Sequence, residues 1–174
     1  MSEFNSKFIK YLCLLLFLKG CAYFNTFYNA EEHFDLAERI RIENLGNQIP
    51  SRAIQEYGRA IDKSEKVLRE YSDSSYVQDA KFLKGKSHYF RREYDSAVLI
   101  FNQLIQEEGF DQEARYWLAL CKWRDLKPQP AINDLKNLIK EVDSEEFISR
   151  IYLSLGEIYL SIDNSEDAYN NFNK

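Results

Sequence analysis

Apolar residues recur every three or four positions along most of this chain, which is the spacing of one face of a helix. The first stripe predicts a helix over about residues 24–44. Its members are Tyr23, Phe27, Ala30, Phe34, Ala37 and Ile40. After a break at Gly46 and Pro50, a second stripe predicts another helix, which Ser51 is expected to cap. The two stripes together predict a helical pair over about residues 24–71.

Small residues then recur at a fixed interval. A glycine or alanine stands twelve positions before an alanine three times. The pairs are Gly85 and Ala97, Ala119 and Ala131, and Gly156 and Ala168. The three alanines are 34 and then 37 residues apart, and a period near 34 is typical of the tetratricopeptide helix-turn-helix array. We predict that all six residues lie where two helices cross closely, because a larger side chain would push the helices apart.

This period predicts an all-α tetratricopeptide solenoid of about four helix pairs, in which stacking buries the apolar faces. The predicted domain covers residues 21–174. Its pairs are expected at about residues 24–71, 77–108, 112–142 and 145–174. Turns inside the last three pairs are expected at Arg92 and Glu93, Pro128 and Pro130, and Asp163 and Asn164. Because the helix from Ser165 is short and no polar capping helix follows it, we expect a truncated last repeat or a fragment.

Residues 1–20 have the organisation of a signal peptide. Lys7 and Lys10 precede an apolar run that ends at Leu18, and this run is far shorter than the roughly 20 residues that span a bilayer. The tetrapeptide Leu18-Lys19-Gly20-Cys21 resembles the lipobox of bacterial lipoproteins. That resemblance implies cleavage before Cys21 and acylation of this cysteine. The alternative is an ordinary secretory signal followed by an incidental cysteine.

Composition and charge narrow the class of partner. With 45% hydrophobic residues, the chain as a whole is not disordered. Its net charge is −5, and no stripe of Lys and Arg suggests nucleic-acid binding. If Cys13 leaves with the signal peptide and Cys21 carries lipid, Cys121 has no disulfide partner and is expected to pack as a small apolar residue.

Four segments resemble envelope tetratricopeptide lipoproteins. They are residues 21–30, 68–74, 79–87 and 94–97. Within that class they are most similar to the lipoprotein of the outer-membrane β-barrel assembly machinery. The resemblance implies a scaffold, lipid-anchored at the outer membrane and facing the periplasm, that binds assembly components or their clients. Ala22 is not the aspartate that retains some lipoproteins at the inner membrane, which favours the outer membrane.

A partner-binding groove follows from the same resemblance, because the first helix of each tetratricopeptide pair lines a concave surface. The predicted groove residues are Phe82, Lys86, Tyr89, Tyr116, Trp123 and Arg124. Leu153, Glu157 and Leu160 take matching positions in the last pair. Aromatic anchors beside cations suit an extended peptide or a partner loop. The alternative is that Tyr89, Trp123 and Leu160 pack between adjacent repeats.

No motif predicts catalysis, a metal or a cofactor. His33 and His88 lack the spacing of metal ligands, and the chain has no phosphate loop, nucleophile elbow or zinc signature. We therefore expect a non-catalytic scaffold without a cofactor. Two alternatives remain: a periplasmic coordinator of cell-wall or envelope complexes, and the repeat domain of a larger protein whose catalytic part lies beyond Lys174.

Overall fold

The computed structural model describes residues 24–174, and every regular element in this range is a helix. A first helix covers residues 24–43. It is followed by α2 (Ser51–Glu70), α3 (Val77–Phe90), α4 (Tyr94–Leu104), α5 (Asp111–Arg124), α6 (Pro128–Ile139), α7 (Glu145–Ser161) and α8 (Ser165–Phe172). Short connections join these eight helices in chain order, which confirms the predicted all-α class of about four tetratricopeptide-type repeats. The predicted signal peptide and Cys21 lie outside the described residues.

The chain divides into two compact units, which meet in sequence between Arg91 and Arg92. The first unit contains the helix 24–43, α2 and α3, and the second contains α4 to α8. The helices predicted for the repeat at 77–108 are present as α3 and α4, but they belong to different units. The boundaries of the predicted pairs therefore stay predictions.

Tyr57 is at the centre of the core of the first unit. The buried apolar residues of this core are Phe27, Ala30, Phe34, Ala37, Ala53, Tyr57, Ala60, Val67, Ala80 and Leu83. The ring of Tyr57 packs edge-on against Phe34, with centroids 5.7 Å apart, and stacks on Phe90 at 5.2 Å. Its hydroxyl donates to Glu38, which also pairs with Arg41 at 2.7 Å. Burial raises the pKa of Tyr57 well above its ordinary value, so this donor keeps its proton.

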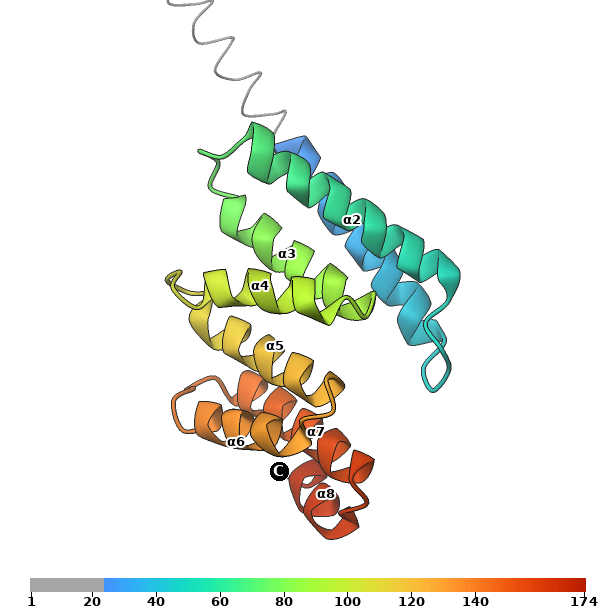
Figure 1. The fold of residues 1–174 in the computed structure, drawn as a ribbon, viewed down its shortest axis with the longest axis vertical. Coiled ribbons are helices and arrows are strands. Elements are labelled where there is room, and N and C mark those ends of the chain that lie inside the picture. Colours follow the sequence, from blue (N-terminus) through green and yellow to red (C-terminus); the bar gives the residue numbers. More distant parts are fainter. Residues whose placement is uncertain (1–23) are drawn as a thin grey trace, which may run out of the picture. The chain divides into compact units, whose positions relative to one another are not determined.

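The second unit is a run of five helices in which each helix packs on the next one in the chain. Figure 1 shows α5 beside α6 and α7 beside α8. Large side chains that are at most 1% exposed fill the space between these helices. They are Phe101, Leu104, Ile132, Leu135, Leu138, Ile151, Leu155 and Ile158. Between α4 and α5, the ring of Phe101 stacks on Trp117 with centroids 6.0 Å apart.

All six recurrent small residues are buried. Ala97, Ala119 and Ala131 are 0% exposed, and Ala168 is 1% exposed. The helices that carry the last two pairs of small residues pack directly on each other, α5 on α6 and α7 on α8. The facing of Gly85 and Ala97 stays a prediction, because these residues belong to separate units.

The spacing did not single out Gly58, where α2 is also closely approached. A Cβ on this residue would lie 2.9 Å from Nη1 of Arg91. That nitrogen donates a hydrogen bond of 2.9 Å to the carbonyl oxygen of Ile54. The glycine therefore leaves room for a side chain from beyond the end of α3 to reach the backbone of α2.

Two predictions of helix starts are wrong. The residue that precedes α2 is Pro50, in an extended conformation, and Ser51 is the first helical residue rather than the cap. The second concerns α6, which begins at Pro128, whereas Pro128 was expected in the turn and the helix from Pro130. A proline is accepted there because the first N–H groups of a helix have no partner within it.

Turns within the last three predicted pairs share an unusual backbone geometry. Each turn has three residues, and the middle residue has a positive φ: 63° at Arg92, 56° at Leu126 and 60° at Asp163. These positions repeat with the same 34- and 37-residue spacing as the alanines. The left-handed conformation costs a non-glycine residue about 1 kcal/mol. Each turn therefore carries local backbone strain.

We expect Leu126→Asn to stabilise the protein by about 0.5 kcal/mol, because Asn enters the left-handed region more readily than Leu. Leu126 is 90% exposed, so little buried area is lost. The matched control is Leu99→Asn, at an exposed position within α4, which should destabilise by about 0.5 kcal/mol through its lower helix propensity. Urea unfolding measures both changes, and destabilisation by Leu126→Asn would contradict the strain.

Gly156 marks a close contact between α7 and α8. A Cβ built on this glycine would overlap the ring of Phe172. Glycine within a helix costs about 1 kcal/mol relative to alanine, so the ring contact has to offset this cost. The small residue at this position is therefore required by the aromatic side chain that covers it.

A double-mutant cycle tests this contact. In the wild type, Gly156→Ala should destabilise by about 1 kcal/mol, because displacement of the ring outweighs the gain in helix propensity. In a Phe172→Ala background the same change should stabilise by about 1 kcal/mol, since no ring is left to displace. Urea unfolding of the four proteins gives the coupling. Effects of equal size and sign in both backgrounds would refute the contact.

Candidate functional site

Three polar links join α5 to α7, which are the first helices of the last two predicted pairs. The linked residues are Glu113 and Arg150, Tyr116 and Ser154, and Trp123 and Ser161. The hydroxyl groups of Tyr116 and Ser154 lie 2.8 Å apart, and Nε1 of Trp123 donates to Ser161 at 3.0 Å. The partners are 37 or 38 positions apart in sequence, so the links repeat at nearly one repeat length. We call them the α5–α7 ladder.

Arg150 is the most connected member of this ladder. Besides its ion pair with Glu113, its guanidinium lies 4.8 Å from the ring centroid of Tyr116 and 4.4 Å from that of Phe147. Both contacts are in the range of cation–π attraction. Burial raises the pKa of Tyr116, although its hydrogen bond with Ser154 partly offsets this effect. The ladder therefore fixes the side chains of both helices along their shared edge.

Two leucines beside the ladder are exposed. Leu153 is 55% exposed and Leu160 is 51% exposed, and the exposed Glu157 lies between them on the same stripe of α7. From α5, Arg124 places its guanidinium 3.8 Å from the ring centroid of Trp123. We call the surface formed by five residues the α5–α7 face: Trp123, Arg124, Leu153, Glu157 and Leu160. It combines exposed aliphatic groups, an indole and a cation, which are typical of protein-binding surfaces.

The predicted groove residues of the second unit differ in accessibility. Tyr116 is only 5% exposed, so its side chain offers little surface to a partner, and packing was not considered for it in the sequence. Trp123 is half-buried and reaches Ser161 of the next repeat, whereas Arg124 is exposed. Leu160, for which packing was also considered, is half exposed. The accessible part of the predicted groove in this unit therefore consists of Trp123, Arg124 and the α7 stripe.

In the first unit, Phe82 and Lys86 line a cavity of about 370 Å³. Its other lining residues are Phe27, Glu31, Tyr76, Asp79 and Leu83. Nζ of Lys86 lies 4.4 Å from the ring centroid of Phe34 and 5.2 Å from that of Phe82. Tyr89 is 7% exposed and packs edge-on against Phe90, which favours its packing alternative.

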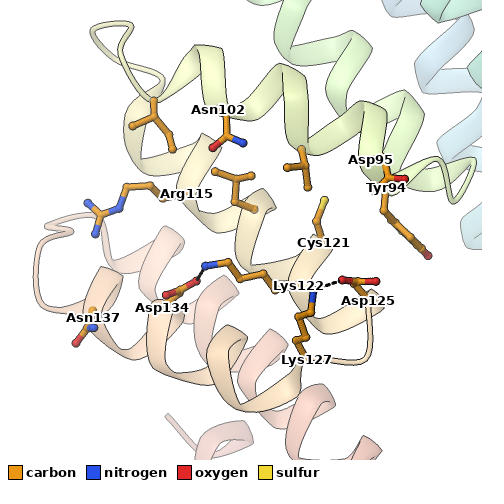
Figure 2. A pocket seen from close by; sticks show the side chains of 13 residues that line it. Tyr94, Asp95, Asn102, Arg115, Cys121, Lys122, Asp125, Lys127, Asp134 and Asn137 are labelled. Atoms are coloured by element: carbon orange, nitrogen blue, oxygen red, sulfur yellow. Dashed lines mark hydrogen bonds and ion pairs between the residues drawn. The ribbon is translucent and has the colours of Figure 1, made fainter.

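A second concavity in the second unit was not predicted. This α4–α5–α6 groove has a volume of about 590 Å³ (Figure 2). Its apolar lining consists of Val98, Ile105, Leu118 and Cys121. Its polar lining consists of Tyr94, Asp95, Asn102, Arg115, Lys122, Asp125, Lys127, Asp134 and Asn137. It contains none of the six predicted groove residues.

Sequence reasoning missed these features for two different reasons. The ladder partners Arg150, Ser154 and Ser161 could have been found by comparing polar residues 37 or 38 positions apart. The α4–α5–α6 groove has no such signal, because its lining mixes apolar residues with charges of both signs. Cys121 lies in this lining but is 1% exposed, and burial raises the pKa of its thiol to about 12. It therefore packs as an unreactive apolar group.

His33 takes part in a contact between helices. Its Nδ1 lies 2.7 Å from Oε2 of Glu56, which is 5% exposed and also accepts a hydrogen bond of 2.8 Å from Arg59. Within residues 24–174, no three His, Cys, Asp or Glu side chains are grouped so that they could hold a metal ion. In the same residue range, no helix is long and apolar enough to cross a bilayer.

Comparison with known proteins gives distant likenesses. No family model matches the chain. Over 106 residues, it is 30% identical to DnaJ homolog subfamily C member 3 of Gallus gallus, in an alignment that covers 59% of this chain. The alignment covers 19% of that relative, so the chain spans about a fifth of its length. A crystal structure of MamA resembles the chain with a TM-score of 0.45 and 18% identity, over 83% of this chain and 75% of MamA.

The molecule's own geometry defines its class. Sequential helix pairs, three-residue turns and a spacing of 34 and 37 residues are the features of a tetratricopeptide-type repeat domain. Such a domain is a protein-binding array whose scaffold is typically non-catalytic.

Proposed function

We propose that this chain is a non-catalytic scaffold that binds an extended segment of a partner protein on the α5–α7 face. The exposure of Leu153 and Leu160 on one stripe of α7 carries this proposal. The two half-exposed leucines offer apolar area, and Arg124, stacked on Trp123, adds a cation. Because the ladder already fixes the neighbouring side chains, binding here costs little conformational entropy.

We further propose that the scaffold is anchored by lipid on Cys21 at the outer membrane of a bacterial envelope, faces the periplasm, and assists the assembly of β-barrel proteins. The sequence Leu18-Lys19-Gly20-Cys21 and the likeness of the mature chain to envelope tetratricopeptide lipoproteins support this placement. Several acyl chains, at about 0.8 kcal/mol per buried CH₂, hold a protein on a membrane without a spanning helix. The partners are then assembly components or their unfolded clients.

Site-specific photo-crosslinking in intact cells tests the face and its partner together. A photoreactive residue replaces Leu153 or Leu160, and captured proteins are identified by mass spectrometry. We expect β-barrel precursors or assembly components, captured at least tenfold more than from Leu99, a matched leucine that is 67% exposed on α4. Leu160→Asp should weaken the capture from position 153 about tenfold, through loss of apolar contact and a buried charge.

The outcomes separate the proposals. Capture of cell-wall enzymes instead of β-barrel proteins would favour the coordinator of envelope complexes. Equal capture from positions 153 and 99 would contradict the α5–α7 face itself. Leu99→Asp serves as the matched charge control for Leu160→Asp, and the same loss of capture in both would mean that charge alone disturbs the protein.

Fatty-acid labelling tests the anchor. We expect the wild type to incorporate labelled palmitate and to sediment with membranes, because the thiol and the new amino terminus of Cys21 carry the acyl chains. Cys21→Ser removes the acceptor thiol, so labelling should fall to background. Cys121→Ser is the matched control, and it should keep full labelling since that thiol is buried. Equal labelling of wild type and Cys21→Ser would rule out this anchor.

A further inference from the structure

The α4–α5–α6 groove lies on the opposite side of α5 from the α5–α7 ladder. Leu118 lines the groove, while Tyr116 belongs to the ladder, and residues two apart on a helix point about 200° away from each other. Every lining residue belongs to the second unit. The groove is therefore a separate site, and its chemistry has to be judged from its own walls.

Each cation along the walls of the groove already has a carboxylate partner. Lys122 of α5 pairs with Asp134 of α6 at 2.5 Å, and Lys127 pairs with Asp125 at 2.5 Å (Figure 2). Arg115 makes two hydrogen bonds, of 2.6 and 3.0 Å, with Glu141 just outside the lining. The remaining charged residue of the lining, Asp95, also interacts electrostatically with Lys127. A charged ligand would therefore have to disturb one of these interactions. The walls therefore favour an uncharged occupant.

Two side-chain amides stand on opposite walls. Asn102 comes from α4 and Asn137 from α6, and both are exposed (Figure 2). Within the described residues the amide of Asn102 has no hydrogen-bond partner, and Asn137 uses only its oxygen, which accepts from Lys140 at 3.0 Å. An amide offers donors and an acceptor, which is the complement of a peptide group. The pair can therefore hold the main chain of a peptide between the two walls.

The length of the groove limits the peptide. On α5 the lining extends from Arg115 to Asp125, which at about 1.5 Å per residue is about 15 Å. An extended chain advances about 3.3 Å per residue, so four or five residues fit. Alternate side chains of such a segment point to one side and meet the half-buried Val98, Ile105 and Leu118.

We propose that the α4–α5–α6 groove binds an extended, uncharged peptide segment of four or five residues whose alternate side chains are aliphatic. The apolar lining takes these side chains, and Asn102 and Asn137 bond the main chain. This site is additional to the α5–α7 face and does not depend on the partner or membrane proposed for that face.

Nuclear magnetic resonance of the full ¹⁵N-labelled chain tests the site with the capped peptide acetyl-Val-Ser-Val-Ser-Val-amide. We expect shifts at the backbone amides of Leu118 and Cys121 and at the side-chain amide of Asn102. Asn102→Ala should weaken binding about two- to tenfold, as the loss of one hydrogen bond does. Leu118→Gln should weaken it about tenfold. The matched control Leu99→Gln, outside the groove, should change it less than twofold.

Several results would overturn the proposal. These are the absence of shifts at millimolar peptide, shifts confined to the α5–α7 face, and equal binding after the central Val of the peptide is replaced by Glu. Stronger shifts with a helical peptide or a small apolar molecule would also overturn it. Shifts that depend only on protein concentration would overturn it too, because they would indicate that a second copy of this chain occupies the groove. If Leu118→Gln does not fold, the exposed Asn102→Ala decides the test. None of these outcomes bears on the α5–α7 face, which is tested separately by crosslinking from position 153.

Discussion

The distance at which consecutive helices can approach each other governs this structure. A helix pair leaves one apolar face uncovered, and the next pair can cover it only if the axes come within about 8–10 Å. Small residues leave room for such an approach, and they are buried where α5 packs on α6 and where α7 packs on α8. Gly156 shows how close this approach can be, because the ring of Phe172 occupies the space that a Cβ would need. Large residues such as Leu135 then fill the volume beside each close approach.

The same stacking determines which side chains reach the surface. Because α5 and α7 lie edge to edge, polar groups one repeat apart in sequence meet in the ladder and satisfy each other. This takes Tyr116 into the interior and orders Trp123 against Ser161. Leu153 and Leu160 stay exposed on a neighbouring stripe of α7. An apolar stripe held in this way binds a partner at a lower entropic cost than the same residues on a mobile loop.

Periodicity was enough to predict most of the fold. The apolar stripe of the first helix is buried from Phe27 to Ala37 as predicted, and the turn at Asp163 falls where polar residues indicate it. Helix starts were harder, because Pro128 is compatible both with a turn and with a first helical turn. Contacts between repeats could not be deduced from local patterns. Tyr116 meets Ser154, which lies 38 positions away, so only a comparison at the repeat length could have indicated this pairing.

The position of α5 explains why one helix can serve two sites. Its Ala114, Trp117 and Cys121 are buried, its Tyr116 and Trp123 join the ladder, and the remaining side is lined by Leu118 and its charged neighbours. The ladder side exposes leucines and a cation, which suits a larger protein surface. The groove side pairs each of its cations with a carboxylate, and within the described residues it leaves the amide of Asn102 and the NH₂ group of Asn137 without partners. This suits a short uncharged segment. Because the two sides face away from each other on a single rigid helix, an occupant of one does not sterically block the other.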